Sequence, residues 1–241
     1  MSRSTPAVTW LGHATFFLET PGGEQLLVDP WLADNPSCPE EYQEVEPDGI
    51  LLTHGHSDHV ANLEAAAARS NGPIVAIFEL GEWVKSTGVA EERVVQMNKG
   101  GTTRLEGLGV EVTMTDARHS SAVVEEDGVR YAGEPAGYVV HFSDDLSLYI
   151  AGDTCLFPGM ELIARLHDPD AAVLPIGDHF TMDPEAAALA CELLEIDTVV
   201  PCHWGTFPLL TGTPEQLEEE LDRRGVETDV ASLEPGERWR R

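Results

Sequence analysis

The chain contains very few basic residues. Lysine occurs only at Lys85 and Lys99, and lysine and arginine together number 14 against 43 aspartates and glutamates, which gives a formal net charge of −29. Such an acidic chain repels polyanions, so we expect no nucleic-acid partner and no membrane partner. The acidic residues are spread along the sequence, and a hydrophobic content of 42% excludes a disordered acidic chain. We therefore predict a halophilic cytoplasmic protein, in which salt screens the self-repulsion.

Cysteine is also scarce. The four cysteines (Cys38, Cys155, Cys191 and Cys202) form no CxxC pair, which excludes a zinc ribbon and a thioredoxin-like redox motif. No signal-peptide pattern opens the sequence, so we expect no disulfides. Cys155 and Cys202 lie near candidate metal ligands, and we interpret both as small buried hydrophobic residues.

Apolar runs typical of strands alternate with helical patterns along the whole chain. No Ser/Gly-rich linker or low-complexity block interrupts them, which predicts one domain over residues 1–241. Asp183 and Thr213 each precede a proline and are favourable helix N-caps. The alternation favours an α/β sandwich whose two sheets are covered by helices. Strands are expected at residues 74–77 and 171–176, and helices at residues 60–69, 79–87, 184–194 and 214–224.

One segment, His54-Gly55-His56-Ser57-Asp58-His59, places three imidazoles and one carboxylate in six positions. It follows residues 49–53, an apolar run bounded by turn residues that predicts a short buried strand. Ligand sites of α/β folds lie at such strand ends. Unpaired polar groups are costly in a buried loop, whereas metal ions would pair them. The first two histidines could hold one ion, and the adjacent Asp58 and His59 could hold a second.

Three later positions show the same local pattern of an apolar strand followed by a metal-competent side chain. One segment cannot complete two coordination spheres, so we expect further ligands from these strand exits. These positions are His119, Asp153 and His203.

Two further histidines are candidates for catalysis. His13 lies in a Gly-His-Ala-Thr turn, and His179 follows Gly177-Asp178 after an apolar run. Both could reach a site at the strand ends, where they would donate to a substrate or protonate a leaving group. The alternative for each is a packing histidine bonded to the backbone. His141 and His167 lack such a context, and we interpret them as structural or surface residues.

The HxHxDH motif, followed in order by His119, Asp153 and His203, resembles the metallo-β-lactamase superfamily. The resemblance runs from Val8 to about Pro208. It implies a four-layer αββα sandwich with the metals at one edge, between the sheets. The chain is also similar to the UlaG-like branch of metal-dependent hydrolases, in the segments Trp10–Phe16, Leu27–Pro30, Ala151–Thr154, Pro175–Met182 and His203–Pro208.

Carried over position by position, the resemblance implies two divalent metal ions. Asp153 would bridge them, and Asp29 would hold the His-rich loop in shape by bonding a ligating histidine. The alternative for Asp29 is a turn residue before Pro30. Zinc is the default for this donor set, although manganese, iron and nickel also fit it. The other ligands to the first ion would be His54, His56 and His119, and those to the second would be Asp58, His59 and His203.

The expected chemistry is metal-assisted hydrolysis of a small-molecule substrate. A water between two ions about 3.5 to 4 Å apart would lose a proton near neutral pH and give a metal-bridged hydroxide. That hydroxide would attack an ester, lactone, amide or phosphodiester. Asp58 would then be a metal ligand, whereas a one-metal site would make it a general base. No Ser-His-Asp arrangement is evident, and none is needed.

Two other functions stay open. A redox metalloenzyme of the di-iron or dioxygenase type could use the same scaffold, although His at position 56 is typical of hydrolytic members. A non-catalytic binding protein is disfavoured, because all seven expected metal ligands are present in the sequence. Arg118 is the only basic residue beside a predicted ligand, which weakens the case for a sugar-phosphate substrate.

The segment Ser120–Gly137 departs from the regular pattern. It is rich in Glu, Gly and Ser, and it predicts a hairpin or a mobile flap over the site, where loops usually decide specificity. The sequence does not decide the oligomeric state. Because relatives in this branch often assemble, a homo-oligomer stays open.

Overall fold

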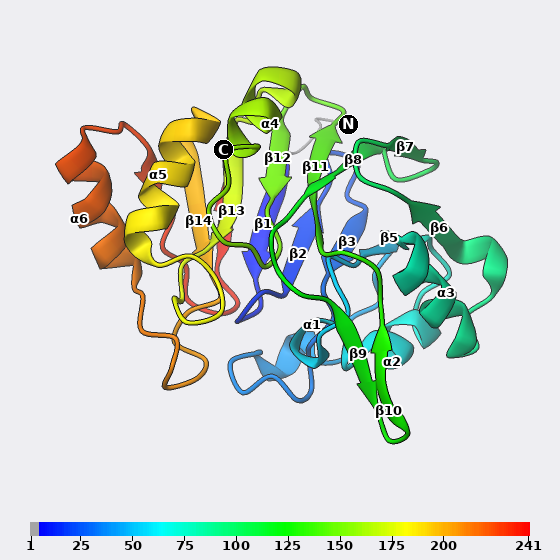
Figure 1. The fold of residues 1–241 in the computed structure, drawn as a ribbon. Helices are drawn as coiled ribbons and strands as arrows, with labels where there is room; N and C mark the ends of the chain where they lie inside the picture. Colours follow the sequence, from blue (N-terminus) through cyan, green and yellow to red (C-terminus); the bar gives the residue numbers. More distant parts are fainter. Residues whose placement is uncertain (1–4) are drawn as a thin grey trace.

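The apolar runs form two seven-stranded sheets that face each other in the computed structural model, which describes residues 5–241 (Figure 1). The first sheet has the spatial order β16 (Arg238–Arg240), β1 (Ala7–Trp10), β2 (Phe16–Glu19), β3 (Gln25–Val28), β4 (Gly49–Leu51), β5 (Ile74–Ile77) and β6 (Val94–Met97). The second has the order β15 (Asp229–Val230), β14 (Thr198–Cys202), β13 (Ala171–Pro175), β12 (Ser147–Ile150), β11 (Ala136–Phe142), β8 (Val110–Asp116) and β7 (Thr102–Leu105).

Buried side chains alternate between the two faces of the second sheet, so its strands contribute to two separate cores. On β11, Tyr138 and Val140 join the core between the sheets, whereas Val139 joins the core under the outer helices. On β12, Leu148 and Ile150 point inward in the same way, and Tyr149 points outward. Because successive strand side chains lie on opposite faces, one fully buried strand supplies both cores.

Helices cover the outer face of each sheet, which confirms the predicted four-layer αββα sandwich (Figure 1). On the side of the first sheet lie α1 (Ser57–Val60), η1 (Glu40–Tyr42), α2 (Leu63–Ala68), α3 (Phe78–Ser86) and η2 (Glu91–Arg93). The second sheet is covered by α4 (Met160–His167), α5 (Pro184–Leu194) and α6 (Pro214–Arg224). None of the helices within residues 5–241 combines the length and the apolar character that a membrane crossing requires.

The two helices with strong N-cap signals begin and end as predicted. Asp183 accepts a hydrogen bond from the Ala186 amide at 2.8 Å, and Thr213 forms a capping box with Gln216. The prediction of one helix over residues 60–69 is wrong, because the chain forms two short helices separated at Asn62. The amide of Asn62 donates to the Pro30 carbonyl at 2.9 Å, and its side-chain oxygen accepts from the Leu32 amide at 2.6 Å. These contacts divert the backbone from helical bonding.

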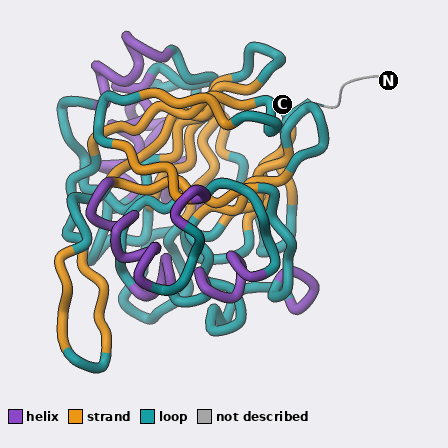
Figure 2. Tube along the Cα trace, turned by 90° about the vertical axis from the view of Figure 1, so that its right-hand side faces the viewer, coloured by secondary structure: helices purple, strands orange, loops and turns teal. Residues whose placement is uncertain are grey.

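The segment Ser120–Gly137 forms a hairpin, one of the two predicted alternatives. Strands β9 (Ala122–Glu125) and β10 (Gly128–Tyr131) pair only with each other and extend away from the sandwich (Figures 1 and 2). Glu125 accepts a hydrogen bond from the indole N–H of Trp83 at 2.8 Å, which ties the hairpin to α3. Its base lies beside the His-rich loop that follows β4.

Candidate metal centre

The His-rich loop leaves the carboxyl end of the parallel strand β4 and runs directly into helix α1. His56 is the N-cap of that helix, so Asp58 and His59 lie in its single turn. The loop also packs tightly against the base of the hairpin. A Cβ at Gly55 would lie 2.7 Å from the Ala132 Cβ, closer than real Cβ atoms come to each other. A residue without a side chain is therefore required at this crossing.

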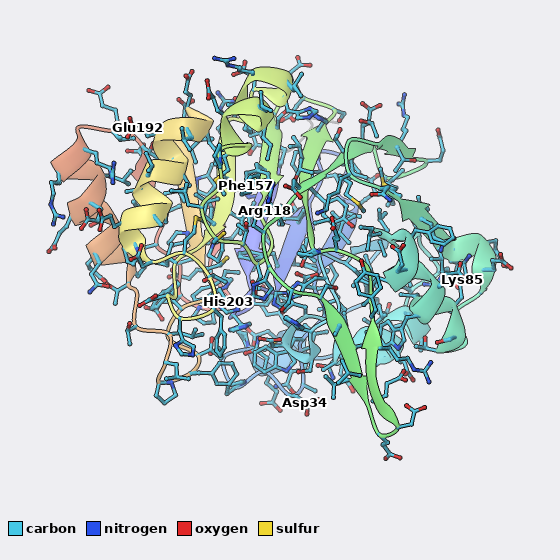
Figure 3. The ribbon with its side chains drawn as sticks, viewed as in Figure 1. Asp34, Lys85, Arg118, Phe157, Glu192 and His203 are labelled. Carbon is cyan, nitrogen blue, oxygen red and sulfur yellow. The ribbon has the colours of Figure 1, made fainter. Side chains whose placement is uncertain are left out.

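The predicted metal ligands converge as two neighbouring clusters of nitrogen and oxygen atoms. In each cluster, one ligand atom of every member lies within 4.8 Å of the others. The clusters come from strand exits of both sheets, and Figure 3 shows His203 on the side of the molecule where the hairpin projects. The first cluster contains His54, His56 and His119. The second contains Asp58, His59 and His203 together with His13.

Asp153 lies between the two clusters. Its Oδ2 atom is 3.1 Å from His203 Nε2 and 3.4 Å from His59 Nε2, in the second cluster. The same oxygen is 3.6 Å from His119 Nε2 and 4.0 Å from His54 Nε2, in the first. One buried carboxylate oxygen therefore faces imidazole nitrogens of both clusters.

The polar atoms of this centre fit metal ions. Within residues 5–241, the buried side-chain atoms without a hydrogen-bond partner include His59 Nε2, Asp153 Oδ1 and both ring nitrogens of His203. Buried polar atoms are nearly always paired, and their unpaired state is costly. Imidazole nitrogens and carboxylate oxygens are the donors that zinc and related ions take. A cation among them would supply the missing partners.

Asp29 determines which ring nitrogen carries the proton in two of the predicted ligand histidines, His54 and His59. Its Oδ2 atom accepts from His59 Nδ1 at 2.7 Å and from the Thr53 hydroxyl at 2.6 Å, and its Oδ1 accepts from the Thr53 amide at 2.8 Å. The Thr53 hydroxyl has only one proton, so at 3.1 Å it accepts from His54 Nδ1. In their neutral forms, which bind metal, both imidazoles therefore present an unprotonated Nε2 to the centre. The orienting role that the resemblance implied for Asp29 has this geometric basis.

Carboxylates also set the charge preference of the centre. Burial by itself lowers the pKa of His59, but the carboxylates of Asp153 and Asp29 outweigh it and raise the pKa well above its usual value. Burial by itself raises the pKa of Asp153, but His203 and His59 lower it well below its usual value. The environment thus favours negative carboxylates with positive charge beside them, the arrangement that a bound cation would supply.

His13 lies behind Asp58 and does not line the cavity at the centre. Its fully buried ring donates from Nε2 to Asp58 Oδ2 at 3.1 Å, because an ionised carboxylate only accepts. Its Nδ1 then accepts from the Thr206 hydroxyl, also at 3.1 Å. Burial lowers the pKa of His13 to about 4, although its hydrogen bond to Asp58 opposes this, so the ring is neutral at pH 7. The structure places His13 as a partner of Asp58.

The backbone is strained around the centre. His13, Asp29 and His203 have φ angles of 55°, 49° and 56°, in the left-handed region that favours glycine. Asp178 and His179 follow with 66° and 52°. Such backbone is retained only where the surroundings determine it, and it gathers at functional sites.

His179 does not lie at the cavity, and its predicted role as a proton donor stays a prediction. Its exposed ring packs edge-on against Phe180, with ring centroids 4.4 Å apart, and it does not line the cavity. That cavity has a volume of about 330 Å³. Sequence reasoning missed Thr53 and Thr206, which act through tertiary contacts, and it missed the cavity residues Ser57, Ser120, Val124 and Phe180.

The cysteines are not part of the centre. Cys202 is buried as predicted, and burial raises the pKa of its thiol well above the usual value, which disfavours a thiolate ligand. The prediction that Cys155 is buried is wrong: its side chain is exposed. The amide of Cys155 bonds the Arg118 carbonyl at 3.1 Å, which holds the chain at the surface as it leaves Asp153. His141 and His167 contact each other outside the centre.

Known proteins resemble this chain over nearly its whole length. The model of the beta-lactamase superfamily domain matches residues 24–204. A UPF0173 metal-dependent hydrolase from Rubrobacter xylanophilus is 49% identical over 232 residues, which cover 95% of this chain and 94% of that protein. Igni18, a metallo hydrolase from the archaeon Ignicoccus hospitalis, has a TM-score of 0.84 and 32% identity, with 98% of each chain covered.

One structural neighbour is a redox enzyme. CmlA, a diiron beta-hydroxylase from Streptomyces venezuelae, has a TM-score of 0.75, with 99% of this chain and 54% of that chain covered. Its identity of 17% shows a shared fold and nothing finer. The relatives with high identity are hydrolases, and the UlaG-like assignment stays a prediction. The chain therefore belongs to the metallo-β-lactamase superfamily, among the UPF0173 metal-dependent hydrolases.

Proposed function

We propose that the chain is a dinuclear metallohydrolase, acting as one domain over residues 1–241. The observation that carries this proposal is the position of Asp153 Oδ2, which faces imidazole nitrogens of two clusters. A mononuclear site would need only one of these clusters. Two ions would be held by three side chains each and bridged by Asp153.

Each predicted ligand has a role in this proposal. The first ion would be held by His54, His56 and His119, and the second by Asp58, His59 and His203. Ions held there would lower the pKa of water near to neutrality and so supply a nucleophile, besides polarising the substrate oxygen. Zinc suits the donor set best, and manganese, iron or nickel would also fit it.

The remaining residues orient the ligands. Asp29 and Thr53 fix the tautomers of His59 and His54, as their hydrogen bonds support. His13 holds the Asp58 carboxylate, which we assign as a ligand and not as a general base. The role of His179 as proton donor to a leaving group stays a prediction, because its ring packs against Phe180 and does not line the cavity.

Metal content and hydrolysis test the proposal together. Protein loaded with zinc and freed of excess metal should contain two ions per chain by elemental analysis, and it should hydrolyse a substrate from a panel of esters, lactones and phosphodiesters. Asp153→Ala should lower both metal content and rate, whereas His167→Gln, a change at a histidine outside the centre, should lower neither. Two ions and full activity in Asp153→Ala would refute the bridging role.

The redox alternative rests on the fold shared with a diiron hydroxylase. It predicts that protein purified with its native metal contains iron and consumes oxygen with a reductant. The same preparation distinguishes the two functions, because a hydrolase consumes neither oxygen nor reductant.

A further inference from the structure

The cavity over the metal centre, of about 330 Å³, has room for a small substrate and is lined by both polar and apolar residues. Its lining includes residues of the metal clusters, among them His56, His119 and Asp153. Ser57 and Ser120 add hydroxyl-bearing residues to the lining. The two apolar lining residues are Val124 and Phe180, which we call the apolar wall. Polar groups thus meet the reacting end of a substrate, and apolar groups meet the rest.

No lysine or arginine lines this cavity in the described part of the chain. His119 also lines a separate depression that contains Lys99 and Arg118, and both of these cations are paired with carboxylates. Lys99 Nζ contacts Asp116 at 2.6 Å and Glu134 at 3.0 Å, and Arg118 Nε contacts Asp116 at 2.9 Å. A substrate phosphate would therefore find no basic side chain, and the net charge of −29 would repel it at longer range.

The first residue of the apolar wall, Phe180, is held in position by its own backbone and by the packing of its loop against the His203 loop. Phe180 is 52% exposed, and it follows the left-handed residues Asp178 and His179. This loop packs backbone to backbone against the His203 loop, since a Cβ on Gly177 would lie 1.9 Å from the His203 carbonyl oxygen. The strained path thus fixes Phe180 beside the metal cluster. An exposed aromatic side chain held by strained backbone is typical of a binding contact.

Val124 faces the cavity from the hairpin and is 69% exposed. The base of the hairpin contacts the His-rich loop, because the Gly55 amide donates to Ser121 Oγ at 3.3 Å. Ser120 Oγ lies 3.4 Å from His56 Nε2. Val124 lies between β8 and β11, and Phe180 lies between β13 and α5, so only the folded second sheet brings them to one cavity.

From this arrangement we infer that the substrate is an uncharged carboxylic ester or lactone whose acyl part is apolar, seated between Val124 and Phe180. The inference rests on the proposed hydrolase function and names its substrate class. Water adds to the acyl carbon, the bond from that carbon to the alcohol oxygen breaks, and the alcohol oxygen takes up a proton. Ester and water give a carboxylic acid and an alcohol, and no other reactant is needed.

The zinc-loaded protein is assayed with p-nitrophenyl acetate, butyrate and hexanoate, and with bis(p-nitrophenyl) phosphate. We expect kcat/KM to rise about twofold to fourfold per methylene along the ester series, because each buried methylene gains up to ~0.8 kcal/mol. The phosphodiester should be the poorest substrate. A preference for the phosphodiester, or no dependence on chain length, would overturn the inference.

Matched variants assign the preference to the apolar wall. Phe180→Ala and Val124→Ser should flatten the chain-length dependence, with p-nitrophenyl acetate least affected. Phe78→Ala and Leu166→Ser change side chains that are 53% and 75% exposed but lie outside the cavity, and they should leave the dependence unchanged. Equal effects of the wall and control variants would contradict the assignment.

Binding of a neutral apolar fluorophore, N-phenyl-1-naphthylamine, gives a readout that does not depend on turnover. Its Kd for the zinc-loaded protein should rise at least fivefold in Phe180→Ala and stay unchanged in Phe78→Ala. Failure to hydrolyse any substrate of either kind would refute the hydrolase proposal itself. Hydrolysis of the phosphodiester alone, with an unchanged Kd in Phe180→Ala, would refute only the substrate class.

Discussion

Replacing Asp29 by asparagine tests how hydrogen bonds to the predicted ligands control the metal centre. The carboxylate accepts three hydrogen bonds, from the Thr53 amide, the Thr53 hydroxyl and His59 Nδ1, at 2.8, 2.6 and 2.7 Å. Asparagine keeps the size, and its oxygen can still accept from the Thr53 amide. Its NH2 group then faces two donors, so the His59 proton is driven from Nδ1 to Nε2, the atom that should bind metal.

The expected cost follows from that change of tautomer. Loss of a hydrogen-bond partner of a metal ligand typically lowers metal affinity about 10-fold to 100-fold, or roughly 1.4 to 2.7 kcal/mol. We expect a loss of this size at the site of His59. A smaller loss is expected at the site of His54, which depends on Asp29 only through Thr53. Zinc affinities measured at pH 7.5 by competition with a chromophoric chelator would resolve the binding of the two ions.

Asp48→Asn is the matched control. Asp48 Oδ2 also accepts a backbone hydrogen bond, from the Gln25 amide at 2.8 Å, but it lies outside the metal centre. Zinc affinity should be unchanged in this variant. If Asp29→Asn bound both ions within twofold of the unmodified protein, the tautomer reasoning would be refuted.

Three further predictions concern stability. Gly55→Ala should lower the free energy of unfolding by about 1–3 kcal/mol in urea titrations, because its Cβ would lie 2.7 Å from the Ala132 Cβ. An unchanged urea midpoint would show that the hairpin base moves freely. Thr213→Ala removes the capping box of α6 and should cost about 1 kcal/mol in the same assay, and a cost near zero would contradict the assigned cap. The thermal midpoint should rise from dilute buffer to molar KCl, as salt screens the net charge of −29, and greatest stability in dilute buffer would refute the halophilic interpretation.

Features set by short stretches of sequence could be predicted. The bounds of α5 and α6 follow from local N-caps at Asp183 and Thr213, and the structure has both caps. The ligand positions follow from a repeated pattern of buried strand and exit residue. Because parallel strands end at one edge, His119, Asp153 and His203 meet the His-rich loop there.

Features that depend on tertiary contacts could not be predicted. Asn62 breaks a helical pattern only because the Pro30–Leu32 loop bonds it. Cys155 stands beside a buried ligand in sequence, yet its side chain is exposed. Phe180 lines the cavity because two residues with left-handed backbone, Asp178 and His179, precede it. No local sequence pattern predicts that backbone conformation.

Anomalous diffraction from crystals of the zinc-loaded protein would show directly whether the centre holds two ions. We expect two zinc peaks, roughly 3.5–4 Å apart, with Asp153 Oδ2 bonded to both. One cluster should ligate each ion. A single zinc ion, or two ions with Asp153 bonded to neither or only one, would contradict the dinuclear centre.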